Sequence, residues 1–197
     1  LASRISHEIG LHGFFHIPFS KCSRNVAASE IELGKKAAGN FGIDPKSWVF
    51  PENKIGHVDL LAAHGINVYR QRHAGANIKT HHNRLTSILR KMSKLTIARP
   101  IVPEHRDGIW ELPSSSGFGN LLRARLGLRR AVLANQVFHI WFHPRNILEG
   151  SVNLSDLNSF LGSAARKRDR GQIEVRTMIG VVDELSTARD KLELHTR

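Results

Sequence analysis

The sequence predicts an α/β protein in which helices cover a parallel sheet. Predicted strands and helices alternate from the start of the chain to its end, as they do in proteins built from strand–helix–strand units. The strands are short apolar runs, and the helices carry apolar residues at helical spacing. With 197 residues, the chain is long enough to bury a sizeable core. We therefore expect one domain over residues 1–197, either an open sheet or a closed barrel.

The first part of the chain contains three predicted strands and two predicted helices. Apolar side chains recur every three or four positions in the helices, and Gly39 and Gly65 mark their ends. Pro51 closes the second strand, and the third strand alternates apolar and polar residues. In chain order, we expect the end of a buried strand at 8–11, a helix at 25–38, a strand at 47–50, a helix at 54–64 and a strand at 66–70.

The rest of the chain begins with a polar loop at 71–80 and continues the alternation. Residues 137–143 give the strongest strand signal, and Pro144 ends it. Asn153 or Ser155 can cap the following helix, whose last turn is basic and which Gly171 closes. The other expected elements are helices at 83–95, 121–135 and 179–194, irregular chain at 99–116 with a strand at 109–112, and a strand at 172–178.

The charge balance is strongly basic. The net charge is +12, from 29 Lys and Arg residues against 17 Asp and Glu residues. This balance favours attraction to nucleic acid, anionic polysaccharide or lipid headgroups, and it also fits a basic surface on a soluble protein. Because no aromatic-interleaved strand pattern accompanies the basic residues, we expect no nucleic-acid partner.

The sequence does not determine the cellular compartment of the protein. There is no run of eighteen or more apolar residues, so we expect no transmembrane segment. Cys22 is the only cysteine, which excludes an internal disulfide. The chain starts at Leu1 with no signal sequence, so we expect an upstream segment that carries any targeting information. Cytoplasmic and cell-envelope locations are both compatible with this sequence.

Histidines follow two of the predicted strands. His12 and His16 come after the first strand, and His143 ends the strand at 137–143. The carboxyl ends of parallel strands converge on one face, and one helical turn's spacing can aim two imidazoles at one metal ion. The alternative is that His12 and His16 are surface or hydrogen-bonded core histidines. For His139, which shares a strand face with His143, we favour a hydrogen-bonded core position.

Four stretches of the chain resemble motifs of the polysaccharide deacetylase (NodB-homology) family. The stretch EIGLHGFFH (8–16) resembles the second motif, and SWVFPEN (47–53), with DLLAAHG (59–65) and Tyr69-Arg70 after it, resembles the third. The stretch VFHIWFHP (137–144) is similar to the last motif, and RGQIEVRTM (170–178) to the closing strand. The resemblance covers nearly the whole chain in the family's order.

This resemblance implies a distorted (β/α)7 barrel and a metal-dependent enzyme. Family members remove acyl groups, typically acetyl groups, from N-acetylated sugars with a divalent metal ion that is usually zinc. By resemblance, His12 and His16 would be metal ligands, and His143 would be the general acid that protonates the leaving amine. The candidate substrate-binding residues at the strand ends are Pro51, Asn53 and Trp141.

The chain also departs from the family pattern. The family's first motif is a strand ending in paired aspartates, which supply the catalytic base and the third metal ligand, and this chain has no such pair. We therefore expect a barrel that is incomplete at its N-terminus, weak metal binding and no useful turnover by this chain alone. Val49 stands where an arginine is usual, and Gly13 where Ser or Thr is usual. The alternative function is that of a non-catalytic carbohydrate-binding relative.

Overall fold

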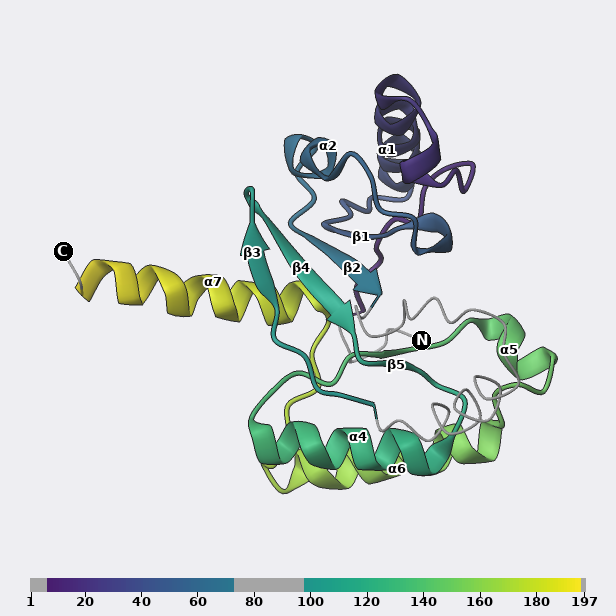
Figure 1. The fold of residues 1–197 in the computed structure, drawn as a ribbon, viewed down its shortest axis with the longest axis vertical. Helices are drawn as coiled ribbons and strands as arrows, with labels where there is room; N and C mark the ends of the chain where they lie inside the picture. The colour runs from purple at the N-terminus through teal and green to yellow at the C-terminus, as the bar shows by residue number, and fades with distance from the viewer. Residues whose placement is uncertain (1–6, 73–97, 196–197) are drawn as a thin grey trace, which may run out of the picture. The chain divides into compact units, whose positions relative to one another are not determined.

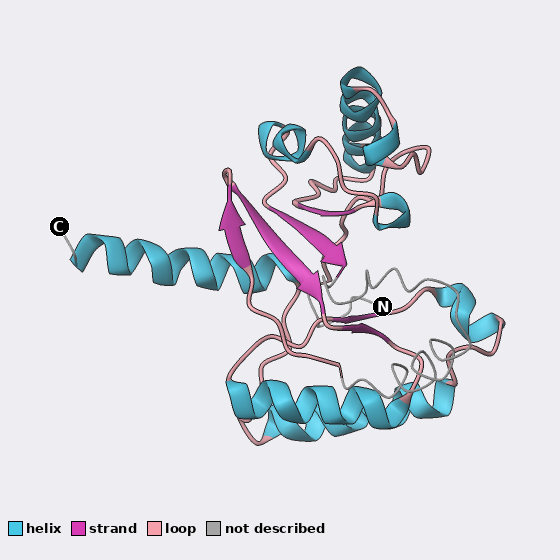
Figure 2. Cartoon of the chain, in the orientation of Figure 1, coloured by secondary structure: helices cyan, strands magenta, loops and turns pink. Residues whose placement is uncertain are grey.

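The computed structural model describes residues 7–72 and 98–195 and shows a mixed α/β protein, which confirms the predicted class (Figure 2). The chain divides into two compact units. The first unit comprises Leu1–Gln71, Pro103–Leu112 and Arg176–Arg197, and the second comprises Arg72–Val102 and Pro113–Val175. The helix predicted at 83–95 and most of the loop predicted at 71–80 lie outside the described residues.

The first α-helix of the first unit is α1 (Arg24–Gly39), and its N-terminus is capped. The Ser23 hydroxyl accepts a hydrogen bond from the Val26 N–H and so satisfies one of the N–H groups that a helix start leaves unpaired. The apolar spacing of the sequence places one face of α1 in the core, as predicted for residues 25–38. Helix α2 (Val58–Ala63) is shorter than predicted, and the residue before it, His57, has a left-handed φ of 50°.

A four-stranded sheet forms the centre of the first unit. Its order is β1 (Ser47–Val49), β2 (Val68–Arg72), β4 (Ile109–Ser114) and β3 (Glu104–Arg106). Strands β1 and β2 are parallel, with Ser47 opposite Val68, whereas β3 and β4 form an antiparallel pair. The first three of these strands match predicted strands. Their apolar side chains form a core with α1, α2 and the 3-10 helix η1 (Phe19–Lys21), and this core contains Phe19, Ile31, Trp48, Phe50, Leu60, Leu61 and Ile66.

The strand predicted at residues 8–11 is only a single pairing at the edge of this sheet. Leu11 lies parallel to Trp48, with its N–H donating to Ser47 O at 2.9 Å and its C=O accepting from Val49 N at 2.8 Å. Ile9 is 56% exposed, so the stretch is not the buried strand that we expected. The pairing nevertheless fixes the point where the His12–His16 loop leaves the sheet.

The second unit packs two long helices against a two-stranded parallel sheet. Helices α4 (Leu121–Ala134) and α6 (Leu154–Asp169) run side by side (Figure 1), and both begin at asparagine caps that accept main-chain N–H bonds. Strands β5 (Ser116–Gly117) and β6 (Ile140–Trp141) pair next to them, and the short helix α5 (Pro144–Leu148) follows β6. Phe118, Leu128, Val152, Leu157 and Phe160 form the core of this unit.

Two strand predictions in the later part of the chain were wrong, one in its extent and the other altogether. The strand predicted at 137–143 is reduced to β6 and one antiparallel pairing of Val137 with Ile101, because His139 donates its N–H to the Ser115 hydroxyl instead of to a strand. The strand predicted at 172–178 is irregular chain, with Val175 67% exposed, and it leads directly into helix α7 (Met178–His195). The predicted helix at 179–194 is confirmed.

Helix α7 belongs to the first unit. The Glu8 carboxylate accepts a hydrogen bond from the Ile179 N–H in the first turn of α7, where negative charge is favoured. Among the helices that the structure describes, none is long and apolar enough to cross a membrane, in agreement with the sequence. A closed barrel is not seen in the described part of the chain, and the predicted barrel stays a prediction.

Candidate functional site

His12 leaves the edge of the sheet with its ring held by the main chain of β1. Its Nδ1 lies 2.7 Å from Val49 O. Because a carbonyl oxygen can only accept, Nδ1 must carry the hydrogen, and in the neutral ring the lone pair is then on Nε2. A hydrogen bond of this kind, from one ring nitrogen to a main-chain carbonyl, is how proteins orient a histidine that binds a metal through its other nitrogen.

His16 faces His12 across the loop. The two Nε2 atoms are 3.1 Å apart, and the rings meet edge to face at 80°. Two nitrogens that each lie about 2.1 Å from one zinc ion at a tetrahedral angle are about 3.4 Å apart. The observed separation therefore suits two ligands of a single ion. It also suits a hydrogen bond in which one ring donates to the other.

A buried carboxylate holds the loop between the two histidines. Glu30 on α1 is 2% exposed, and its two oxygens accept from the main-chain N–H groups of Phe14 and Phe15 at 2.9–3.1 Å. Bonds from N–H groups to a carboxylate are charge-assisted and stronger than neutral ones. Helix α1 therefore sets the conformation of the loop that carries His12 and His16.

Gly13 is required by this arrangement. Its φ is +80°, and a Cβ added there would lie 2.9 Å from the Glu30 carboxylate and 3.3 Å from Pro51 Cγ. Both the left-handed backbone and the close approach exclude a side chain without rearrangement. A Ser or Thr side chain at this position would therefore meet Glu30 and Pro51.

Two of the predicted substrate-binding residues, Pro51 and Asn53, lie in the 3-10 helix η2 (Pro51–Asn53) that follows β1. Pro51 is buried against the histidine loop. The Asn53 side-chain oxygen accepts from the Arg70 guanidinium at 3.1 Å, and Arg70 is 8% exposed. Burial lowers the pKa of Arg70 from its ordinary value, so this bond helps to keep a charge inside the unit.

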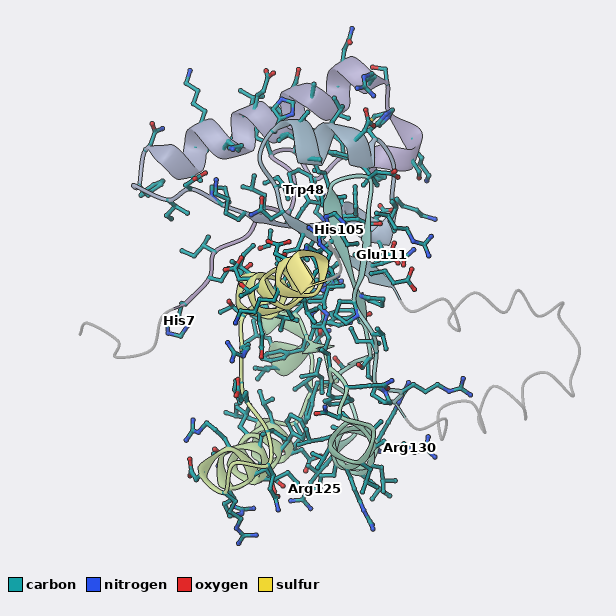
Figure 3. The ribbon with its side chains drawn as sticks, turned by 90° about the vertical axis from the view of Figure 1, so that its left-hand side faces the viewer. His7, Trp48, His105, Glu111, Arg125 and Arg130 are labelled. Carbon is teal, nitrogen blue, oxygen red and sulfur yellow. The ribbon has the colours of Figure 1, made fainter. Side chains whose placement is uncertain are left out.

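Tyr69, the residue before Arg70, is joined to the neighbouring strand β4. Its hydroxyl donates to the Glu111 carboxylate at 2.7 Å (Figure 3 labels Glu111), and its ring packs against Phe50. Burial, followed by the bond to Glu111, raises the pKa of the Tyr69 hydroxyl above its usual range. Tyr69 therefore stays neutral and ties the strand that carries Arg70 to β4.

The remaining predicted site residues, His143 and Trp141, belong to the second unit. His143 is exposed at the start of α5, where its main-chain N–H donates to the Asn146 side-chain oxygen at 2.9 Å. Its ring meets that of Trp141 at a centroid distance of 5.3 Å, and Trp141 in turn lies over Gly117. His139 is part-buried with its ring nitrogen 3.2 Å from Pro113 O, in agreement with the core position favoured from the sequence.

The structure thus brings some of the predicted residues together and keeps others in separate units. His12, His16 and Pro51 meet at the histidine loop in the first unit, and Trp141 and His143 meet in the second. The expected clustering of His143 with the histidine pair stays a prediction. Within residues 7–72 and 98–195, no group of three or more His, Cys, Asp or Glu side chains is placed to hold a metal ion.

Sequence reasoning missed the residues that support the histidine pair. Glu30 is the only charged position on the buried stripe that it shares with Ala27, Ile31 and Gly34, and this interruption of an apolar stripe is the signal that could have found it. Phe14 and Phe15 are 45% and 68% exposed beside the histidines. Exposed aromatic rings at a site are a common feature of ligand-binding surfaces.

Comparisons of the chain with protein families, with curated proteins and with solved structures find no match.

Proposed function

We propose that the protein is a metal-dependent hydrolase that removes N-linked acetyl groups from a carbohydrate, on a distorted (β/α)7 barrel of the polysaccharide deacetylase type. The observation that carries this proposal is the convergence of His12 Nε2 and His16 Nε2 at 3.1 Å, with His12 Nδ1 held by Val49 O. Both rings come from the stretch that resembles the family's second motif. An oriented pair of imidazoles is the chemistry that a zinc site needs first.

His12 and His16 would hold a divalent metal ion, with zinc favoured because both donors are imidazole nitrogens. When bound, such an ion supplies a Lewis acid that polarises the amide carbonyl and lowers the pKa of a bound water. Catalytic zinc sites have three protein ligands, and the resemblance assigns the third to a paired-aspartate motif that precedes this stretch. Residues 1–6 contain no aspartate, so we expect weak metal affinity for this chain.

We assign the other roles to His143, Trp141 and Asn53. An exposed imidazole such as His143 can donate a proton to the leaving amine, provided that the substrate comes within hydrogen-bond reach of it. The Trp141 ring beside it offers a flat surface to a sugar. In the first unit, Arg70 has only donors, so Asn53 must turn its oxygen toward Arg70 and its amide N–H groups elsewhere. Those N–H groups can donate to sugar hydroxyls.

A zinc titration tests the metal site. Calorimetry on the full chain should show binding near one zinc per chain, and His12→Ala and His16→Ala should each reduce the affinity at least about tenfold. His105→Ala is the matched control, since His105 is an exposed histidine of the same unit that bonds Arg189 instead. Equal affinity in the wild type and in all three variants would remove the site from consideration.

Acetate release tests the reaction. It should be measured with a panel of N-acetylated oligosaccharides on the longest natural form of the protein, because the chain described here lacks the paired aspartates. The wild type should release acetate, and His143→Ala should lower kcat by about 100-fold or more. Unchanged turnover in this variant would reject His143 as the general acid.

A second function is favoured by a specific observation. The lack of a three-ligand group among the described side chains, together with Gly13 and Val49 at positions where the family usually has other residues, fits a carbohydrate-binding relative without activity. This alternative predicts that oligosaccharides bind with no acetate release from any natural form. It also predicts that zinc leaves the affinity for the oligosaccharide unchanged.

A further inference from the structure

The excess positive charge of the protein lies entirely in the second unit. Counted over the whole sequence, the second unit holds 16 of the 29 Lys and Arg residues but only 4 of the 17 Asp and Glu residues, a net charge of +12. The first unit holds the remaining 13 basic and 13 acidic residues, a net charge of zero. The polyanion attraction that the sequence suggested is therefore a property of one unit.

Helix α4 presents part of this charge. Helix α4 contains four arginines and no acidic residue, and three of the four, Arg125, Arg129 and Arg130, are exposed (Figure 3 labels Arg125 and Arg130 at the surface). The basic run 166–168 in the last turn of α6 is followed by Asp169, which forms an ion pair with Arg168 at 2.8 Å. A hydrogen bond from the Arg125 guanidinium to the Ser159 hydroxyl at 2.8 Å joins α4 to α6.

Exposed leucines lie among these arginines. Leu122 and Leu133 on α4 are 63% and 77% exposed. Leu122, Arg129 and Leu133 follow helical spacing along one side of α4, since residues seven and eleven positions apart lie about two and three turns along the same face. An exposed side of α4 thus alternates leucine and arginine.

We propose that this exposed side of α4 binds the surface of an anionic lipid bilayer. Arginines attract lipid phosphates, and leucines at the same depth can enter the boundary between headgroups and acyl chains. A nucleic acid or an anionic polysaccharide would use the arginines but gain little from Leu122 and Leu133. The pairing of both residue types on one face therefore selects the lipid surface. This inference is independent of the proposed deacetylase activity.

Vesicle co-sedimentation of the full chain tests the charge requirement. The protein should bind vesicles of phosphatidylglycerol and phosphatidylcholine, should not bind phosphatidylcholine alone, and should be released by added salt. Arg129→Gln with Arg130→Gln should weaken binding about 25-fold, from about fivefold for each basic residue at the surface. The control, Lys21→Gln with Lys36→Gln, removes the same charge from exposed positions of the neutral first unit and should change binding less than twofold.

The leucines separate a lipid surface from other polyanions. Leu122→Ser with Leu133→Ser should weaken vesicle binding about tenfold and leave binding to double-stranded DNA and to an anionic polysaccharide unchanged, whereas Leu33→Ser on α1 should change neither. If the leucine pair proves irrelevant to vesicle binding, the surface recognises charge alone and the lipid assignment is overturned.

The serine variants could misfold, so a second test places a tryptophan, which is also apolar, at the same kind of position. Leu133→Trp should be quenched by brominated lipid, and Leu33→Trp should not. Equal quenching of the two tryptophans, after subtraction of the wild-type signal, would overturn the proposed face.

Discussion

Glu30 and Phe15 are joined by two hydrogen bonds, in which the Phe15 N–H donates to both oxygens of the carboxylate, at 3.1 and 2.9 Å. Glu30 lies in the middle of α1 and is almost fully buried, whereas the Phe15 side chain is exposed. The bond therefore links a fixed position in the core to a loop at the surface. It is the connection through which packing of the first unit determines where His12 and His16 lie.

Glu30→Gln should destabilise the protein by about 1–3 kcal/mol, because the amide offers one acceptor where the carboxylate offers two and turns an N–H group toward a donor. Chemical denaturation measures this change, and the zinc affinity of the His12–His16 pair should fall with it. Glu32→Gln is the control on the same helix, at a side chain that is 66% exposed, and should stay within about 0.5 kcal/mol of the wild type. Equal losses for the two variants would mean that Glu30 does not hold the loop.

Gly13→Ala should be more destabilising than Gly42→Ala. The two glycines have similar positive φ values, +80° and +70°, so both variants suffer about the same backbone strain of order 1 kcal/mol. Only Gly13 would bring its Cβ against Glu30 and Pro51, since nothing lies within 4 Å of a Cβ at Gly42. The difference in unfolding free energy between the variants isolates the close approach, and a difference near zero would contradict it.

Tyr69 is the only tyrosine, so its ionisation can be followed directly by absorbance. Burial and the bond to Glu111 raise its folded-state pKa, so the stability from this group is present below the unfolded pKa of about 10 and is lost as the pH rises above it. In the native protein, we expect the phenolate signal to appear only together with alkaline unfolding. In the unfolded protein in denaturant, we expect it with a midpoint near pH 10. A native-state midpoint near 10, with circular dichroism unchanged, would contradict the buried Tyr69–Glu111 bond.

Asn53→Ala should cost more stability than Asn135→Ala. Both asparagines are left-handed, with φ values of 54° and 50°, so alanine is strained equally at both positions. Asn53 also accepts a charge-assisted bond from Arg70, which should add about 1.5–3 kcal/mol to the loss. Thermal unfolding of the two variants measures the difference. Melting temperatures that fall by the same amount would show that the Arg70 bond contributes nothing.

Much of the fold could be predicted because it depends on local patterns. Helices α1, α4, α6 and α7 begin and end close to the predicted positions, since their apolar spacing and asparagine or serine caps act within a few residues. The strand predicted at 172–178 failed because an apolar alternation does not show whether a partner strand lies beside it. The strand at 137–143 was shortened by a side-chain bond to Ser115, which no periodicity can reveal.

The sequence predicted the histidines of the candidate site but not the residues that orient them. His12 and His16 stand out in the sequence because their spacing is visible within one short stretch. Their orientation depends on Val49 O and on Glu30, which lie 37 and 14–18 residues away and act through the folded main chain. Contacts of that kind depend on tertiary packing. A single sequence therefore contains the contacting residues but does not show which of them contact one another.

The hydrogen bond between Glu8 and Ile179 has a consequence for the order in which the two units can fold during synthesis. It joins positions 171 residues apart, and the first unit also takes a central segment of the chain, Pro103–Leu112. A chain emerging from the ribosome can therefore bring together every segment of the second unit while the first still lacks α7. Completion of the first unit must therefore wait until α7 has been synthesised.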